Sequence, residues 1–190
     1  MYLASTDAAN NLLEHDALAL LIGMLLDQQI PMEKAFTSPE VLRERLGGRL
    51  DLVEIAEYDV DAFEQIFRQA PALHRFPAAM AKRVQALARM LIENYDADPA
   101  SAWTGAKSGE DLVNRIATLP GFGAQKAKIF AALLGKQFAV RPRGWRAATG
   151  DYGVDGSTRS IADVVDADSR KAVRSFKQQS KATAKALQQP

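Results

Sequence analysis

The chain has 190 residues, of which 47% are hydrophobic and 25% are charged, as in ordinary globular proteins of one or two domains. It has no cysteine, which excludes disulfide bonds, cysteine-ligated zinc or iron–sulfur centres and cysteine nucleophiles. The net charge of +1 hides an asymmetry, because residues 1–111 carry 10 Lys/Arg against 18 Asp/Glu and residues 112–190 carry 14 against 5. Unless the two halves neutralise each other, the second half suits a polyanion such as nucleic acid.

The first part of the chain predicts a series of helices. Residues 15–29 are apolar on nearly all sides, which is typical of a buried central helix. Further along, Ser38 can cap a helix that has Pro39 at its first position and Gly47 as its stop. In chain order, the helices predicted here span residues 15–29, 31–36, 38–48, 51–58 and 59–69.

The second part is also predicted to be helical. Residues 77–95 show the longest amphipathic pattern, with apolar side chains at three- and four-residue spacing. The other predicted segments are a helix over 108–119 capped by Ser108, a helix over 124–135 ending at Gly135, a short strand candidate over 136–140, an ordered loop over 141–157 and a basic helix over 166–189. The sequence therefore predicts an all-α bundle of roughly eight to ten helices.

Two further features concern organisation and location. Residues 1–156 are predicted to form one helical domain, with room for two lobes and a cleft between them, followed by a basic helical extension over residues 157–190. The N-terminus lacks a secretory pattern, and the longest apolar run, residues 17–26, is about half the length of a membrane span. We expect a cytoplasmic monomer with no cofactor and no membrane association. His15 and His74 are far apart, so no metal site made of side chains is expected.

The segment "LPGFG" (residues 119–123) separates two predicted helices. Gly121 and Gly123 allow positive φ and close approach of another molecule, and Pro120 fixes the exit of the chain from the first helix. The second helix begins near Ala124, so its uncapped N–H groups point over the loop. Backbone donors at a helix N-terminus suit a phosphate. The alternative is a plain corner between two helices.

The sequence "LPGFGAQKA" resembles the hairpin motif of the helix-hairpin-helix/GPD superfamily of base excision repair DNA glycosylases, which includes endonuclease III and the alkyladenine-type enzymes. A second segment, "LLDQQIPMEKAF" (residues 25–36), resembles the alkyladenine branch, in which a pair of glutamines precedes the next helix. The resemblance covers roughly residues 12–152. It implies an all-α, DNA-glycosylase-like fold and a double-stranded, damaged DNA partner.

By this resemblance the hairpin binds a backbone phosphate, often with a monovalent cation held by loop carbonyls, and Gln28 and Gln29 lie against the duplex. The alternative for the glutamines is that they cap helix carbonyls. Trp145 lies among three arginines, an arrangement that suits a nucleic-acid surface, whereas Phe122 and Tyr152 are expected in the core. The predicted phosphate-binding residues are Leu119, Gly121, Phe122, Gly123, Lys126 and Lys128, and the predicted duplex-contacting residues are Gln28, Gln29, Arg141, Arg143, Trp145 and Arg146.

The resemblance breaks down at the positions that carry the chemistry. The lysine with which some relatives form a Schiff base corresponds to Gln125, which cannot form an imine. Lys126 is adjacent, but one residue turns a helix by about 100°, so it should point elsewhere. The position of the family's catalytic aspartate falls on residues 141–143, "RPR". The first carboxylate after this position is Asp151, which is our candidate for the catalytic carboxylate.

Alternatives to Asp151 remain open. In one alternative, another acid such as Asp27, Glu33 or Asp155 serves as the catalytic carboxylate. In the other, the protein binds DNA without cleaving glycosidic bonds. The sequence thus predicts a monofunctional DNA glycosylase-like hydrolase of base excision repair. The alternatives are an inactive protein that binds lesions or distorted DNA on the same fold, and a helical module whose basic arm binds an acidic protein.

Overall fold

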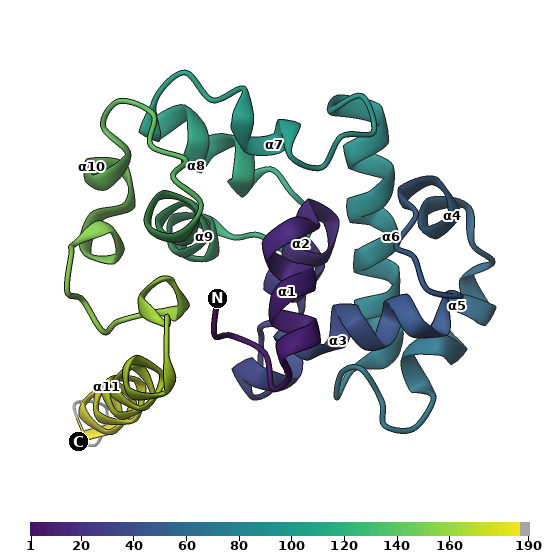
Figure 1. Ribbon diagram of the computed structural model, residues 1–190, viewed down its shortest axis with the longest axis horizontal. Helices are drawn as coiled ribbons and strands as arrows, with labels where there is room; N and C mark the ends of the chain where they lie inside the picture. Colours follow the sequence, from purple (N-terminus) through teal and green to yellow (C-terminus); the bar gives the residue numbers. More distant parts are fainter. Residues whose placement is uncertain (187–190) are drawn as a thin grey trace.

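The computed structural model describes residues 1–186, which form an all-helical molecule without β-strands (Figure 1). The four C-terminal residues, which include the end of the predicted helix 166–189, lie outside this range. The all-α prediction is confirmed, with eleven α-helices in the described part. These are α1 Asp7–His15, α2 Ala17–Leu26, α3 Met32–Arg45, α4 Leu52–Glu57, α5 Val60–Arg68, α6 Pro77–Asn94, α7 Ser101–Thr104, α8 Gly109–Ala117, α9 Ala124–Gln137, α10 Trp145–Thr149 and α11 Ala167–Ala186, with short 3₁₀ helices η1 Gly150–Gly153 and η2 Ile161–Asp163.

The helix α2 is the centre of the fold, as its sequence predicts. All of its residues after Ala17 are buried. It is shorter than the predicted span of 15–29, because the Asp16 carboxylate accepts the Ala19 N–H at 2.9 Å and caps the helix, while the chain leaves the helix after Leu26. The helix α1 precedes it and packs against α2 and α3.

The predicted break before Pro39 is absent, because α3 is one continuous helix that contains this proline. The Ser38 hydroxyl does not cap a helix. It donates to the carbonyl oxygens of Lys34 (2.8 Å) and Leu73 (2.9 Å), and Ser38 and Pro39 are both buried. Tertiary packing therefore stabilises a helical conformation that the local sequence disfavours.

The helices α4, α5 and α6 agree with the predictions and form the side of the molecule farthest from α11 (Figure 1). Asp51 and Asp59 cap α4 and α5 by accepting N–H groups of their first turns. The apolar face of α6 is buried against α4 and α5.

Three predictions around α9 are wrong. Gly135 does not end the helix, which continues to Gln137, and residues 136–140 form no strand. Gly135 instead makes room for Trp145, since a methyl group there would lie 2.5 Å from the indole ring. The predicted loop over 141–157 contains α10, which packs on α8 and α9.

The segment after residue 156, where a domain boundary is predicted, contributes side chains to the core. The side chains of Ile161, Ala162, Val164 and Val173 are fully buried with the residues of the main core. The Lys136 ammonium joins α9 to this segment through the Asp163 carboxylate at 2.5 Å. The division into a domain over residues 1–156 and a basic extension over residues 157–190 stays a prediction.

The first turn of α11 contacts the N-terminal residues of the chain. The Arg170 guanidinium donates to the carbonyl oxygens of Tyr2 (2.7 Å) and Ala4 (2.9 Å). The N-terminal residues of the chain therefore lie against the first turn of α11, which sets the position of α11 relative to α1. Within residues 1–186, the helices are too short or too polar to cross a membrane.

Candidate functional site

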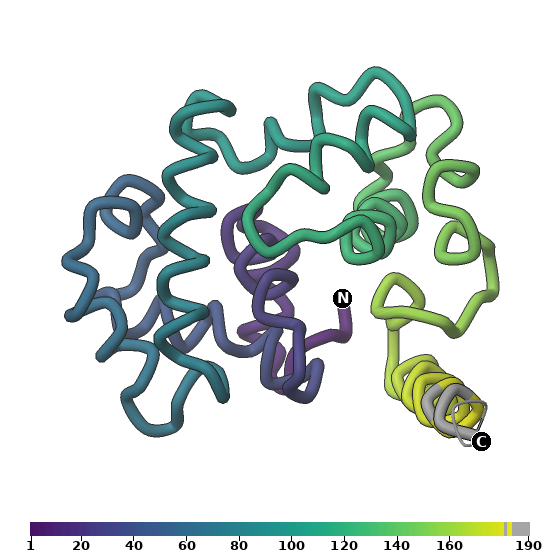
Figure 2. The backbone as a smooth tube through the Cα atoms, turned by 180° about the vertical axis from the view of Figure 1, so that it is seen from behind, coloured from purple at the N-terminus to yellow at the C-terminus, as the bar shows by residue number. Residues whose placement is uncertain are grey.

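The loop between α8 and α9, residues 119–123, crosses beside the N-terminal helices (Figure 2). Gly121 has φ +84°, and a methyl group there would lie 3.3 Å from Leu25 Cγ on α2. This residue therefore needs to be glycine both for its conformation and for its contact. Gly123 has φ −81° and faces open space, so only Gly121 adopts the positive φ that both glycines allow.

The N-terminus of α9 faces outward with its first N–H groups uncapped by any side chain, because its N-cap is Gly123. Leu119 and Phe122 are buried, and Phe122 meets Phe130 edge-on at 5.7 Å. As predicted phosphate ligands, these two residues offer only backbone atoms, since their side chains anchor the loop in the core. An anion can approach the exposed backbone at Gly121 and Gly123.

A monovalent cation at this loop stays a prediction. The carbonyl oxygens of Leu119 and Gly123 each accept one N–H bond, from Phe122 and Ala127. Each oxygen retains a second lone pair for a cation.

The sequence predicts that Lys126 points away from the position of the family lysine and binds a phosphate. The structure instead places its side chain against α2. Its ammonium donates to the carbonyl oxygens of Met24 (2.8 Å) and Leu25 (3.0 Å), at the C-terminal end of α2. Burial lowers its pKa to about 8, although nearby Asp27 opposes this shift. The positive charge thus lies at the negative end of the α2 dipole and fixes the start of α9 against α2. Lys128, in contrast, is exposed.

The two glutamines of "LLDQQI" have different roles. The Gln28 amide donates to the Leu25 carbonyl oxygen at 2.7 Å, and its side-chain oxygen accepts from Arg83 at 3.0 Å. This is the carbonyl-capping alternative, and it leaves the Gln28 side chain little freedom to enter a duplex. Gln29 is exposed, with φ +56°, and is the member of the pair that faces solvent.

His74 holds the same loop from the other side. Its buried ring is bonded through Nε2 to the Gln28 carbonyl oxygen at 2.9 Å, and its Nδ1 accepts the Phe76 N–H at 3.0 Å. These bonds fix the neutral tautomer with the proton on Nε2. Burial lowers the pKa of His74, in agreement with a neutral ring. Phe76 itself is exposed, with Arg75 over its ring.

A cleft of about 1150 Å³ opens beside these elements. This is above the usual range of roughly 300–1,000 Å³ for small-molecule pockets. Its walls are formed by parts of five segments: the end of α2 and the loop into α3, the first turns of α9, the segment 149–152, the segment 159–161, and the face of α11 over residues 173–180.

Residues far apart in the sequence meet in this cleft. The Gln125 amide donates to the Tyr152 hydroxyl at 2.9 Å, which joins the first turn of α9 to the segment 149–152. Asp151 lies on the same segment, 71% exposed, and pairs with Arg159 at 3.2 Å. Asp151 is thus brought to the cleft with Gln125, but its carboxylate is engaged. The rim carries further positive charge from Lys128, Arg174 and Lys177.

The family model described as HhH-GPD superfamily base excision DNA repair protein matches residues 22–189. The chain belongs to this superfamily. A search of curated proteins and a search of solved structures each gave no match. The match spans the second half of α2, the α8–α9 hairpin and the basic α11, so the HhH-GPD assignment covers every wall of the cleft.

The predicted family position for the aspartate, residues 141–143, lies outside the cleft. Arg141 donates to the Gly135 carbonyl oxygen at 2.8 Å, and the Arg143 carbonyl oxygen accepts the Gly109 N–H. Both therefore lie near the C-terminal end of α9, whose 14 residues span roughly 20 Å. In this HhH-GPD protein the chain reaches the cleft again only at residue 149.

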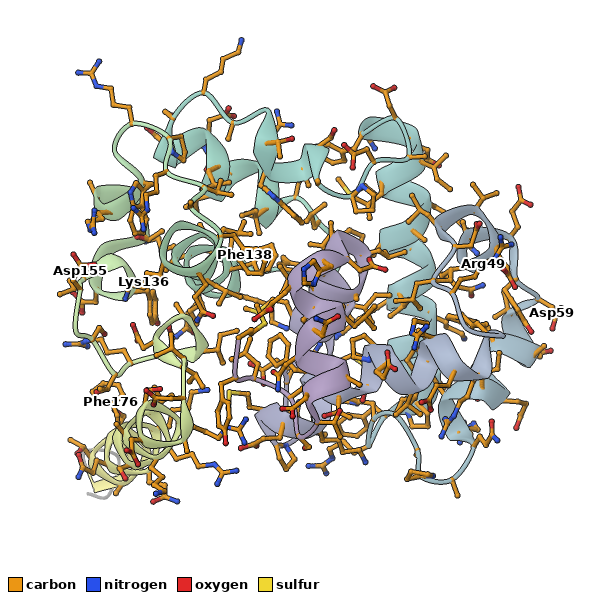
Figure 3. The ribbon with its side chains drawn as sticks, viewed as in Figure 1. Arg49, Asp59, Lys136, Phe138, Asp155 and Phe176 are labelled. Carbon is orange, nitrogen blue, oxygen red and sulfur yellow. The ribbon has the colours of Figure 1, made fainter. Side chains whose placement is uncertain are left out.

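Trp145, a predicted duplex contact, is buried against α9. Its side chain is 6% exposed and packs on Gly135, so it has no face available for a base. Arg146 stacks over this ring at 4.6 Å and binds both oxygens of Asp155, at 2.9 and 2.8 Å. Asp155 lies at the outer edge of the molecule, outside the cleft (Figure 3). Among the arginines predicted to contact the duplex, Arg143 is exposed and forms no ion pair with the described residues.

The remaining acids of the cleft are Asp27 and Glu33. Glu33 forms ion pairs with Arg170 and Arg174. Burial raises the pKa of the Asp27 carboxyl group, an effect that Lys177 and Lys126 partly offset and Glu33 reinforces. Within residues 1–186, no group of three or more His, Asp or Glu side chains is arranged to hold a metal ion.

No sequence motif points to several residues that shape the site. His74 and Arg83 hold Gln28 across 46 and 55 residues, and Tyr152 reaches Gln125 across 27. None belongs to a motif, and their roles follow from tertiary contacts alone. For Arg159 and Lys177, the sequence indicates only that they belong to the basic half of the chain.

Proposed function

We propose that this HhH-GPD protein is a monofunctional DNA glycosylase that hydrolyses the N-glycosidic bond of a damaged base in duplex DNA. The observation that supports it best is one cleft in which the first turn of α9, the loop after α2 and the segment 149–152 meet. The hairpin holds a backbone phosphate beside this cleft, and the cleft receives an extruded nucleotide.

The charges of the cleft support a DNA substrate. Lys128, Arg159, Arg174 and Lys177 surround its mouth. Among the described residues, Arg159 and Arg174 form ion pairs with acids, whereas Lys128 and Lys177 have no acid within 4.0 Å. Exposed Arg75 and Phe76 lie beside the loop that carries Gln29, where an aromatic ring and a cation suit nucleic acid.

A hydrolytic reaction without a Schiff base fits the residues present. Gln125 stands at the lysine position and has an amide, which is not a nucleophile. Lys126 also lines the cleft, but its ammonium is held by two carbonyl oxygens of α2. We therefore expect the abasic product to leave without strand cleavage.

A panel of duplexes that carry single alkylated, deaminated or oxidised bases tests this function. Wild-type protein should release at least one of these bases, detected as strand cleavage only after alkali. Borohydride should trap no covalent complex with the wild type. Release of no base from the panel would remove the enzyme assignment, and trapping that disappears in Lys126→Met would show a lyase.

The variant Gln125→Lys probes the geometry directly, since it restores the lysine at the family position. Borohydride trapping of this variant is expected if Gln125 faces C1′ of the bound nucleotide. The same substitution at exposed Ala124 is the matched control and should trap nothing.

A lesion-binding protein without catalysis is the second candidate. It is favoured by one observation: the family position of the aspartate lies outside the cleft, and Asp151 pairs with Arg159. Tight, salt-dependent binding to damaged duplexes without release of a base would support it.

A further inference from the structure

The cleft holds three carboxylates, and they differ in what they bind. Asp151 is largely exposed and pairs with Arg159, while Glu33 is paired with two arginines of α11. The carboxylate of Asp27 has no hydrogen bond and no ion pair within 4.0 Å among the described side chains. It is therefore the acid whose oxygens are available to a bound molecule.

The backbone of Asp27 is held at the end of α2. It is the C-cap residue of the fully buried helix α2, and its N–H donates to the Gly23 carbonyl oxygen at 3.1 Å. The next residue, Gln28, is fixed by His74 and Arg83. A side chain on such a support keeps its position when a substrate binds.

The surroundings of Asp27 favour a cationic ligand. The carboxylate is partly buried at the C-terminal end of a helix, where the helix dipole disfavours negative charge. Lys126 occupies the carbonyl oxygens of the same helix end and does not bind the carboxylate. In a site with little water, an unpaired carboxylate stabilises a nearby positive charge more strongly than it does in solution.

We propose that Asp27 is the carboxylate that stabilises the sugar cation and takes a proton from the attacking water, a role that rests on the glycosylase function proposed above. In the reaction, the C1′–N bond breaks and its electron pair leaves with the base. The water oxygen forms the new bond to C1′. One water proton passes to Asp27. It then goes to the base anion released from a neutral lesion, or to solvent when the lesion was a cationic base, so that an abasic site and a neutral base remain. The raised pKa of Asp27 suits this proton transfer.

Binding to stable abasic analogues tests the assignment without catalysis. A duplex with a positively charged pyrrolidine in place of the sugar mimics the cation, and a duplex with neutral tetrahydrofuran is its matched control. Wild-type protein should prefer the cationic duplex by about 10-fold or more, and Asp27→Asn should lose this preference. An equal preference in Asp27→Asn, or no preference in the wild type, would overturn the role of Asp27.

Single-turnover release of the base found in the lesion panel gives the second readout. Asp27→Asn should slow the chemical step by roughly 100-fold or more, whereas Asp155→Asn, a change of the same kind outside the cleft, should not. If Asp151→Asn abolishes release and Asp27→Asn does not, the assignment is wrong. Asp27→Ser provides a second variant if Asp27→Asn does not fold, as judged by its thermal melt.

The two proposals fail separately. If no base is released but the preference for the cationic duplex depends on Asp27, the glycosylase function is wrong and Asp27 still marks a cation-binding site on DNA. If a base is released and Asp27→Asn is unimpaired in both readouts, the function stands and another group performs the reaction.

Discussion

The variant Gly123→Val separates DNA binding from folding at the hairpin. Gly123 has φ −81° and ψ 171°, which valine adopts readily, and a Cβ there meets no atom within 4 Å. Replacing a glycine in an allowed conformation changes stability by about 1 kcal/mol or less, mostly through the unfolded chain. The free energy of unfolding should therefore stay close to that of the wild type.

The effect on DNA should be larger. A branched side chain at the N-cap keeps a phosphate away from the uncapped N–H groups of α9. Hydrogen bonds to a charged group contribute about 1.5–3 kcal/mol, so the loss of one predicts a dissociation constant roughly 10- to 100-fold higher. Fluorescence anisotropy with a labelled duplex at fixed salt measures it, and a urea melt checks the fold.

Two further variants make this prediction specific. Because the lost contact comes from neutral N–H groups, Gly123→Val should leave the salt dependence of binding unchanged, whereas Lys128→Ala should lower the slope of log K against log salt by about 0.9. Gly121→Ala should instead destabilise the fold, since its φ is +84° and Leu25 is 3.3 Å from the added methyl. A folded Gly123→Val protein with unchanged affinity would refute the phosphate role of the hairpin.

Three more predictions concern stability. Gly135→Ala should lower the free energy of unfolding by about 1–3 kcal/mol in a urea melt, because its methyl overlaps the Trp145 ring; an unchanged midpoint would contradict that packing. The lowered pKa of His74 means that the unfolded chain binds its proton first, so wild-type stability should fall as the pH drops below about 6.5, by at most about 1.4 kcal/mol per pH unit, and this fall should be smaller in His74→Asn. Lys126, with a pKa of about 8, loses its proton in the fold before it does in the unfolded chain. Wild type should therefore gain stability relative to Lys126→Met between pH 8 and about 10.4, and parallel pH profiles of the two proteins would show that Lys126 is not buried.

The geometry also explains how a divergent HhH-GPD sequence can retain a cleft. The segment that carries the family aspartate in relatives is used here to place arginines and Trp145 on the far end of α9. The chain then returns to the cleft through η1, where Tyr152 bonds to Gln125. This side of the cleft is formed by the segment 149–152 and by α11.

The sequence determined most of the helices of this protein. The apolar run of α2, the amphipathic pattern of α6 and the caps at Asp51 and Ser108 are local features, because a helix forms or ends according to neighbours within one or two turns. The hairpin motif was recognisable for the same reason: its glycines act on adjacent backbone.

Tertiary structure alone decided the rest. Pro39 lies inside a helix, where it is buried and its neighbour Ser38 bonds to the Leu73 carbonyl oxygen. Gly135 ends no helix, and the Trp145 ring packs over it. The direction of the Lys126 side chain also depends on α2, about 100 residues away in the sequence. A short-range pattern contains no information on such distant partners.

The same reason governs the candidate acids. The sequence could place Asp27, Glu33 and Asp151 near recognisable segments, but not say which of them is paired. Pairing depends on arginines supplied by α11 and the segment before η2, and on burial at the end of α2. Residue types are written in the sequence, whereas the charge state and freedom of a carboxylate are set by what the fold packs around it.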